Sequence, residues 1–157
     1  MQSEKCKISN FEFAFSALQR NMDGQLAQGR KITGVVFSDL GRAASFMSLD
    51  RVRRTLGEKL GFFPYPGTLN LRLETDEAMA SWREARERRG IEIPSEEPAH
   101  CHARCFLVEV EGKRRGAVIL PEVEGYPSDK VELIAPVRLK DELRLKDGEP
   151  VTIEFVD

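Results

Sequence analysis

The chain of 157 residues has few cysteines, no long apolar run and a net charge of only −2. Three cysteines, an odd number, argue against a disulfide framework, so we expect a cytoplasmic protein. No apolar run approaches membrane-spanning length and the first residues lack a secretory signal core, so we expect no membrane partner. The small net charge provides no basic field for nucleic acid, so we do not expect nucleic acid as a partner.

The sequence also contains no G-x-x-x-x-G-K-[ST] string, which excludes an ordinary P-loop kinase, and it lacks the protein-kinase motifs. Its length and its hydrophobic fraction of 41% fit one soluble domain with a single core. We expect residues 1–30 to be an N-terminal extension or linker and residues 31–157 to be the domain. We also expect the protein to be a monomer.

The hydrophobic pattern predicts a mainly β protein with helices, in the form of a small β-barrel to which two main helices are appended. The strands are expected at residues 31–37, 68–73, 105–111, 115–120, 131–135 and 151–156. The helices are expected at 50–60 and 76–89, with Asp50 and Asp76 as their N-caps, and a turn of helix is expected within 136–143.

The most informative segment is residues 62–73, where a Pro-Gly turn leads into an alternating strand. Pro66 presets its backbone angle and Gly67 tolerates angles that other residues avoid. Leucines at every second position predict that Thr68 and Asn70 share the opposite strand face. A hydroxyl and an amide oxygen side by side suit a hard cation or a phosphate. A solvated strand edge after an ordinary turn would show the same pattern, so the spacing leaves both interpretations open.

Several segments resemble the archaeal-type CTP-dependent riboflavin kinases. The most specific match is Phe63-Pro64-Tyr65-Pro66-Gly67-Thr68-Leu69-Asn70-Leu71. Weaker matches follow in the family's order at Leu40-Gly41 with residues 46–49, at 116–121, and at 131–136 with 145–148. Together they cover about residues 31–156, which is most of the chain.

The resemblance implies a six-stranded cradle-loop barrel that transfers the γ-phosphate of CTP to the ribityl 5′-hydroxyl of riboflavin, giving FMN and CDP. It implies that Thr68 and Asn70 bind Mg²⁺ and that Glu124 and Glu132 contact the flavin. We add the hypothesis that Glu132 is the catalytic base. The residues implied to bind the nucleotide are Leu40, Gly41, Arg42, Ala43, Ala44, Ser45, Val137, Arg138, Leu139, Lys140, Asp141 and Glu142.

Three positions depart from the family pattern. Ala43 stands where a glycine is usual, which restricts backbone approach to phosphate, although Arg42 can add a compensating charge. Glu124 stands where a threonine that contacts the flavin product is expected, and Lys140 replaces an arginine. These departures motivate an alternative, a non-catalytic sensor of flavin or nucleotide on the same barrel. A DNA-binding regulator is a third possibility, against which the net charge argues.

One further cluster contains both histidines and two of the three cysteines, in the string His100-Cys101-His102-Ala103-Arg104-Cys105. A tetrahedral zinc site usually combines two separated ligand pairs, and the only other cysteine is Cys6. We therefore predict buried cysteines and ordinary histidines here.

Overall fold

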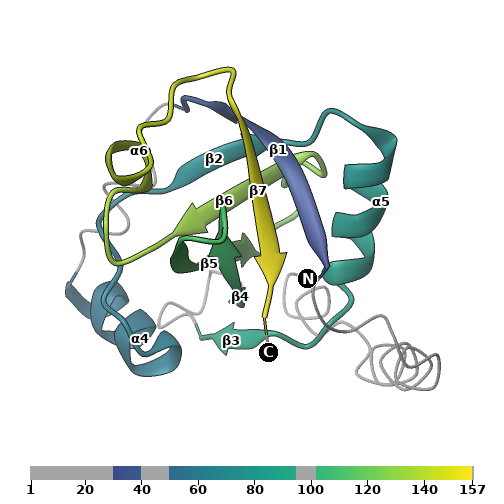
Figure 1. Cartoon of the computed structure of the whole chain (residues 1–157). Helices are drawn as coiled ribbons and strands as arrows, with labels where there is room; N and C mark the ends of the chain where they lie inside the picture. Colours follow the sequence, from purple (N-terminus) through teal and green to yellow (C-terminus); the bar gives the residue numbers. More distant parts are fainter. Residues whose placement is uncertain (1–29, 40–49, 95–101, 157) are drawn as a thin grey trace.

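The computed structural model describes residues 30–39, 50–94 and 102–156, without the side chains of Asp50 and Arg51. In these residues seven antiparallel strands form one sheet in the order β3-β4-β5-β6-β2-β1-β7. Their bounds are β1 Lys31–Phe37, β2 Leu69–Arg72, β3 Ile91–Ile93, β4 Ala103–Val110, β5 Arg114–Pro121, β6 Lys130–Ile134 and β7 Pro150–Phe155. Strand β7 pairs back with β4, so six strands close a barrel and β3 extends it on the outside (Figure 1).

The barrel interior is filled by alternate residues of its strands. Leu69 and Leu71 of β2 point inward, and their paired partners Leu133 and Val131 of β6 do the same. The predicted alternation in this segment is therefore confirmed, and the polar residues between the leucines lie on the outer face of the wall.

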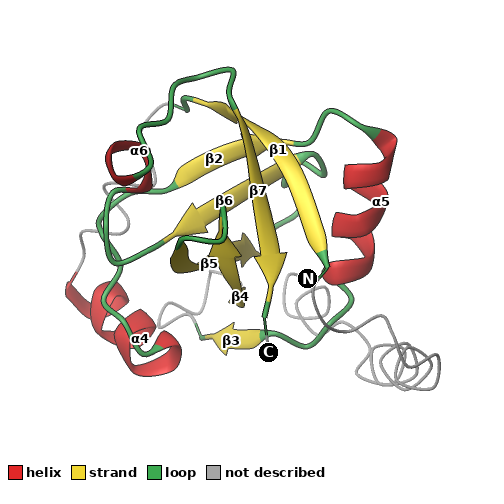
Figure 2. Cartoon of the chain, viewed as in Figure 1, coloured by secondary structure: helices red, strands yellow, loops and turns green. Residues whose placement is uncertain are grey.

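A second apolar cluster covers the outer face of part of the wall. Helix α4, Asp50–Leu60, lies near β3 (Figure 2). Its Leu56 and Leu60 belong to one buried cluster with residues of β3, β4, β5 and β6. Strand β5 consequently has apolar neighbours on both faces, and its residues 116–120 are all buried. Gly61, with φ +84°, follows α4 in the left-handed conformation expected of a glycine after a helix.

Helix α5, Asp76–Ala85, lies beside β1 and contributes Trp82 to the core. The indole stacks on Phe155 at a centroid distance of 6.2 Å and meets Phe106 edge-on at 6.0 Å. These three rings join the helix to β4 and β7, and aromatic pairs of this geometry each contribute about 0.5–1.5 kcal/mol beyond the area they bury.

The start of α5 differs from the sequence prediction. Thr75 is the N-cap, because its extended backbone allows its hydroxyl to accept a hydrogen bond from the backbone N–H of Ala78 at 3.0 Å. Asp76 is the first helical residue, where its negative charge complements the helix dipole. Asp50 is likewise the first residue of α4 rather than a residue before it.

The end of α5 also differs, since the helix stops at Ala85 instead of Arg89. The guanidinium of Arg104 on β4 donates to the carbonyl oxygens of Arg86 and Arg88, at 2.9 and 2.6 Å. Charge-assisted bonds from a neighbouring strand therefore satisfy carbonyls that a longer helix would have used.

Two shorter elements complete the described fold. Strand β3 was not predicted, because three residues are too few for an alternating pattern. Helix α6, Leu139–Glu142, lies within the predicted turn of helix and is anchored by buried Leu139. In the described residues, no helix has the length and apolar character needed to cross a membrane.

Candidate active site

The sheet register brings together two polar residues that are distant in sequence. Asn70 of β2 pairs directly with Glu132 of β6 and, on its other side, with Phe37 of β1. Among the described residues, Asn70 and Glu132 are the two buried polar side chains, with exposed fractions of 7% and 9%. Burial of polar groups costs free energy unless they have hydrogen-bond partners. This pair on the outer barrel wall therefore requires specific polar neighbours.

Short contacts connect Glu132 to three neighbouring side chains. The Thr68 hydroxyl lies 3.1 Å from Asn70 Oδ1 and 3.4 Å from Glu132 Oε1. The Tyr126 hydroxyl donates to the other carboxylate oxygen, Oε2, at 2.5 Å. Lys130 Nζ lies 3.9 Å from Oε1. The carboxylate is thus approached by a donor on each oxygen, with its Oε1 beside the predicted metal ligands.

A cavity of about 550 Å³ opens over this pair, within the range of about 300–1,000 Å³ typical of ligand sites. Gly67 lines it with φ +139°, a conformation that L side chains rarely adopt, so the turn exposes backbone to the cavity. The lining residues are Phe37, Ser38, Asp39, Tyr65, Pro66, Gly67, Thr68, Leu69, Asn70, Lys130, Glu132, Leu133, Ala135, Val137, Arg138, Leu139 and Lys140.

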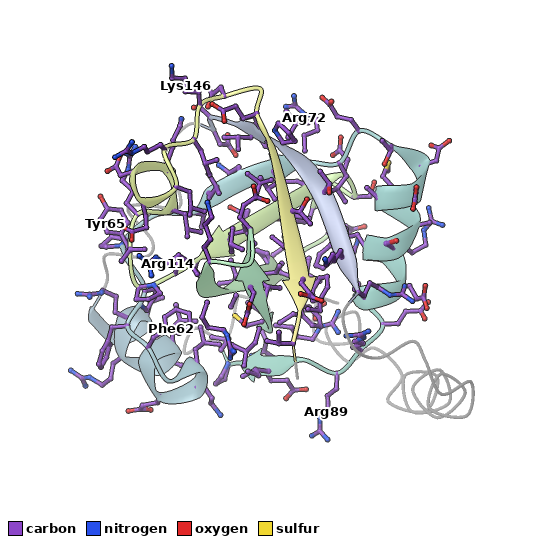
Figure 3. All side chains as sticks on the ribbon, viewed as in Figure 1. Phe62, Tyr65, Arg72, Arg89, Arg114 and Lys146 are labelled. Atoms are coloured by element: carbon purple, nitrogen blue, oxygen red, sulfur yellow. The ribbon has the colours of Figure 1, made fainter. Side chains whose placement is uncertain are left out.

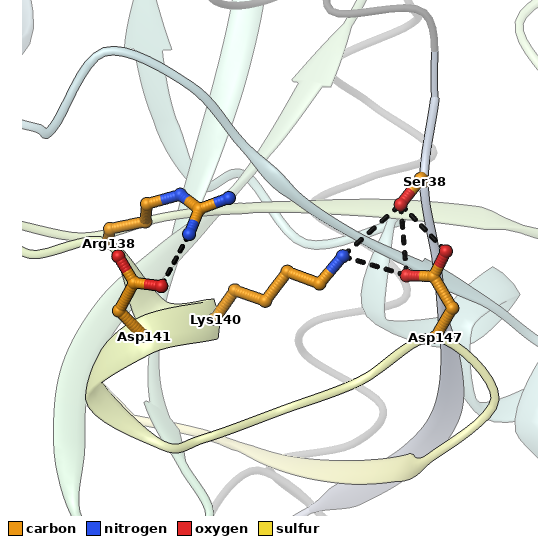
Figure 4. Close-up of polar contacts among 5 residues, drawn as sticks. All are labelled: Ser38, Arg138, Lys140, Asp141 and Asp147. Carbon is orange, nitrogen blue, oxygen red and sulfur yellow. Dashed lines mark hydrogen bonds and ion pairs between the residues drawn. The ribbon is translucent and has the colours of Figure 1, made fainter.

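The side chain of Lys140, a residue of α6, extends towards Ser38 and Asp147 (Figure 4), and both Lys140 and Ser38 line the cavity. Its Nζ donates to Asp147 Oδ1 at 2.8 Å and to Ser38 Oγ at 3.2 Å. Hydrogen bonds from Lys140 and Ser38 lower the pKa of the Asp147 carboxyl, so this carboxylate stays negatively charged at neutral pH. Two of the three ammonium N–H groups are used, which leaves one for a ligand.

Lys130 supplies a second ammonium group in the cavity, with a side-chain exposure of 17%. It forms an ion pair with Asp39 at 2.6 Å and faces Glu132. Lys130, Arg138 and Lys140 therefore line the same cavity, each with an aspartate partner, and their N–H groups suit an anionic ligand.

Comparison with known proteins identifies the family of this chain. The family model CTP-dep_RFKase, described as "Domain of unknown function DUF120", matches residues 36–155. The chain belongs to this CTP-dependent riboflavin kinase family. A protein of Archaeoglobus fulgidus named "Riboflavin kinase" is 41% identical over 129 residues, which are 80% of this chain and 54% of that protein.

Other relatives with the same name differ in length. A protein of Pyrobaculum aerophilum is 39% identical over 129 residues, covering 80% of this chain and 60% of its own length. One of Aeropyrum pernix is 41% identical over 128 residues, covering 79% of this chain and 94% of its own length. The chain thus spans just over half of the first relative and nearly all of the Aeropyrum protein.

The cavity brings together seven of the residues predicted from the resemblance to the riboflavin kinase family, which are Thr68, Asn70, Glu132, Val137, Arg138, Leu139 and Lys140. The predicted segment Leu40–Ser45 lies outside the described residues.

Three other predicted residues do not line this cavity. Asp141 is exposed and pairs with Arg138 at 2.5 Å. Glu142 pairs with Arg114, on the same side of the barrel as α6 and Tyr65 (Figure 3). Glu124 is exposed on the connection between β5 and β6. Their assignment to substrate binding remains a prediction.

Sequence reasoning missed several groups at the site. Lys130 lies two residues before Glu132 on the same strand, so the alternation of β6 was a signal that could have found it. Ser38 and Asp39 follow β1 directly, and only the pairing of β1 with β2 brings them to the cavity. Tyr126, in a connection of irregular structure, carried no signal in the sequence.

The site offers oxygen atoms of the kind that Mg²⁺ prefers. The described residues include no group of three histidine, cysteine, aspartate or glutamate side chains arranged to hold a metal. Thr68 and Asn70 offer two adjacent neutral oxygens on the cavity wall. Mg²⁺ takes oxygen ligands and usually uses few from the protein, keeping waters and substrate phosphates as the rest. The residues present therefore fit Mg²⁺ that binds together with a phosphorylated ligand.

Proposed function

We propose that this protein is a CTP-dependent riboflavin kinase that transfers the γ-phosphate of CTP to the ribityl 5′-hydroxyl of riboflavin, releasing FMN and CDP. The observation that carries the proposal is the cluster of Thr68, Asn70 and Glu132 in one cavity. Family membership and the names of the relatives support it.

The cavity walls suit the binding of a nucleoside triphosphate. Thr68 and Asn70 would hold Mg²⁺, which when bound neutralises charge on the β- and γ-phosphates. Arg138 and Lys140, from the segment that closes the cavity on the α6 side, would bind the nucleotide. Lys130 places further positive charge beside Glu132. Phosphoryl transfer depends on positioning and charge neutralisation, and these residues supply both.

Glu132 has the position required of a general base. Its Oε1 lies 3.4 Å from the Thr68 hydroxyl, and both residues line the cavity in which the ribityl hydroxyl would bind. In the proposed reaction Glu132 accepts the proton of the ribityl 5′-hydroxyl while that oxygen bonds to the γ-phosphorus. The bond from the γ-phosphorus to the bridging oxygen breaks, and CDP departs with its electron pair.

Incubation with riboflavin, Mg²⁺ and either CTP or ATP tests the activity. We expect FMN to form with CTP and to form much more slowly with ATP, measured by chromatographic separation of FMN from riboflavin. A thermal shift on addition of riboflavin or CDP, without FMN from any nucleotide, would instead favour the sensor. If the protein forms no FMN and shows no thermal shift, both functions are contradicted.

Replacement of Lys140 by alanine is expected to raise the KM for CTP about tenfold, since a charged hydrogen bond of roughly 1.4 kcal/mol is lost. The kcat should change little, because Lys140 does not contact Glu132. Stability should also change little, because the Lys140–Asp147 pair is partly exposed to solvent.

The matched control is Lys146→Ala, which removes an exposed lysine from the connection that follows α6. Steady-state kinetics with varied CTP should give wild-type values for this control. Equal KM values for the two variants would contradict a role of Lys140 in nucleotide binding.

A further inference from the structure

Tyr126 lies behind the candidate catalytic carboxylate rather than in the cavity itself. It belongs to the connection between β5 and β6, it is half-buried, and its ring packs against the barrel core. It does not appear among the residues that line the cavity. Any effect of its hydroxyl on a bound ligand must therefore pass through a neighbouring side chain.

The neighbour that the hydroxyl contacts is Glu132. The phenol donates to Oε2 at 2.5 Å, whereas Oε1 faces the Thr68 hydroxyl at 3.4 Å and Lys130 Nζ at 3.9 Å. The two oxygens of one carboxylate thus have distinct surroundings: Oε2 accepts from Tyr126, which is not a lining residue, and Oε1 lies beside Thr68 and Lys130, which line the cavity.

The phenol keeps its proton over the range in which the protein would work. Burial, the hydrogen bond to Glu132 and the negative charge of Glu132 all raise the pKa of Tyr126. Asp39 acts in the same direction and Arg86 in the opposite one, while Lys130 Nζ lies 5.8 Å from the ring centroid. The tyrosine is therefore a permanent donor to Oε2.

We infer that Tyr126 is a positioning residue that fixes the Glu132 carboxylate so that Oε1 meets the attacking hydroxyl of the substrate. This inference rests on the proposed function. The terminal torsion of a glutamate is broad, so a carboxylate without a fixed partner samples many orientations. The phenol removes this freedom and keeps Oε2 from competing for the substrate proton.

The first test is the kinetics of Tyr126→Phe, which removes only the hydroxyl. We expect kcat to fall about tenfold, which is the lower end of the loss seen when a residue that orients a functional side chain is removed. The KM for CTP should stay within about twofold. The melting temperature, measured in parallel, shows whether the variant is folded. An unchanged kcat would overturn the inference.

A double-mutant cycle shows whether Tyr126 acts through Glu132. In the Glu132→Gln background, Tyr126→Phe should cause no further loss of residual turnover, because the group that it positions has already lost its function. A loss of equal size in both backgrounds would overturn the inference, since it would mean that the phenol acts independently of Glu132.

A spectroscopic test does not depend on turnover. In a Tyr65→Phe background Tyr126 is the one tyrosine left, so absorbance follows its ionisation alone. We expect it to ionise well above the usual pKa of about 10, and Glu132→Gln to lower its pKa. Ionisation at the usual pKa would contradict the hydrogen bond between Tyr126 and Glu132. If the wild-type protein shows no turnover, the proposed function is wrong. The titration still decides in that case whether Tyr126 binds Glu132.

Discussion

Loss of the Thr68 hydroxyl or the Asn70 carboxamide is expected to reduce FMN formation at least about a hundredfold while leaving the barrel folded. Outer-shell partners of a metal ligand already cost about 10–100-fold when removed, and a direct ligand should cost more. The two oxygens lie 3.1 Å apart on the cavity wall, so removal of either one leaves an incomplete pair.

The expected loss is specific to the metal requirement and does not come from unfolding. Asn70→Ala removes one side-chain hydrogen bond and Thr68→Val removes two. At about 1 kcal/mol net for each bond, the melting temperature should fall by about 2–4 °C for Asn70→Ala and by about 4–8 °C for Thr68→Val. Turnover should be measured over a wide range of Mg²⁺ concentration. Excess Mg²⁺ should partly restore the turnover of a variant whose only defect is weaker metal binding.

Thr68→Ser is the matched control, because it keeps the hydroxyl and removes only a methyl group. Its turnover should remain within about tenfold of the wild-type protein, well above that of Thr68→Val. If Thr68→Val is as active as Thr68→Ser, or if Asn70→Ala keeps wild-type turnover, the metal role assigned to this pair is wrong.

The strand pattern made much of the fold predictable. Alternation in residues 68–73 correctly separated the core leucines from Thr68 and Asn70, and the six predicted strands are the six that close the barrel. The N-cap of α5 was misassigned because Thr75 and Asp76 are both good capping residues, and only backbone geometry distinguishes them.

The assembly of the site could not be predicted from local pattern. Thr68 and Glu132 are 64 residues apart, and they meet because β2 pairs with β6 in one particular register. A shift of one residue would turn Glu132 to the barrel interior. Spacing alone therefore left Glu132 without a partner, and the family resemblance supplied the connection that the register now explains.

Replacement of Glu132 by glutamine is expected to lower kcat by about 10²–10⁴-fold, the usual contribution of a general base. Glutamine keeps the shape of the side chain and can still accept from the Tyr126 hydroxyl through its amide oxygen. Lys130 loses a partner at 3.9 Å but keeps its ion pair with Asp39 at 2.6 Å, so the free energy of unfolding should change little. Steady-state kinetics and thermal unfolding of the same preparation measure both effects.

Glu92→Gln makes the same chemical change at an exposed position of β3 and should leave kinetics at wild-type values. The effects of Glu132→Gln on kcat and on KM then distinguish the two roles implied for Glu132, general base and ligand of the flavin. A base that acts only on the reacting hydroxyl lowers kcat and leaves the KM for riboflavin unchanged. If instead that KM rises while kcat stays near the wild-type value, Glu132 only binds the ribityl chain, and the proton must leave by another route.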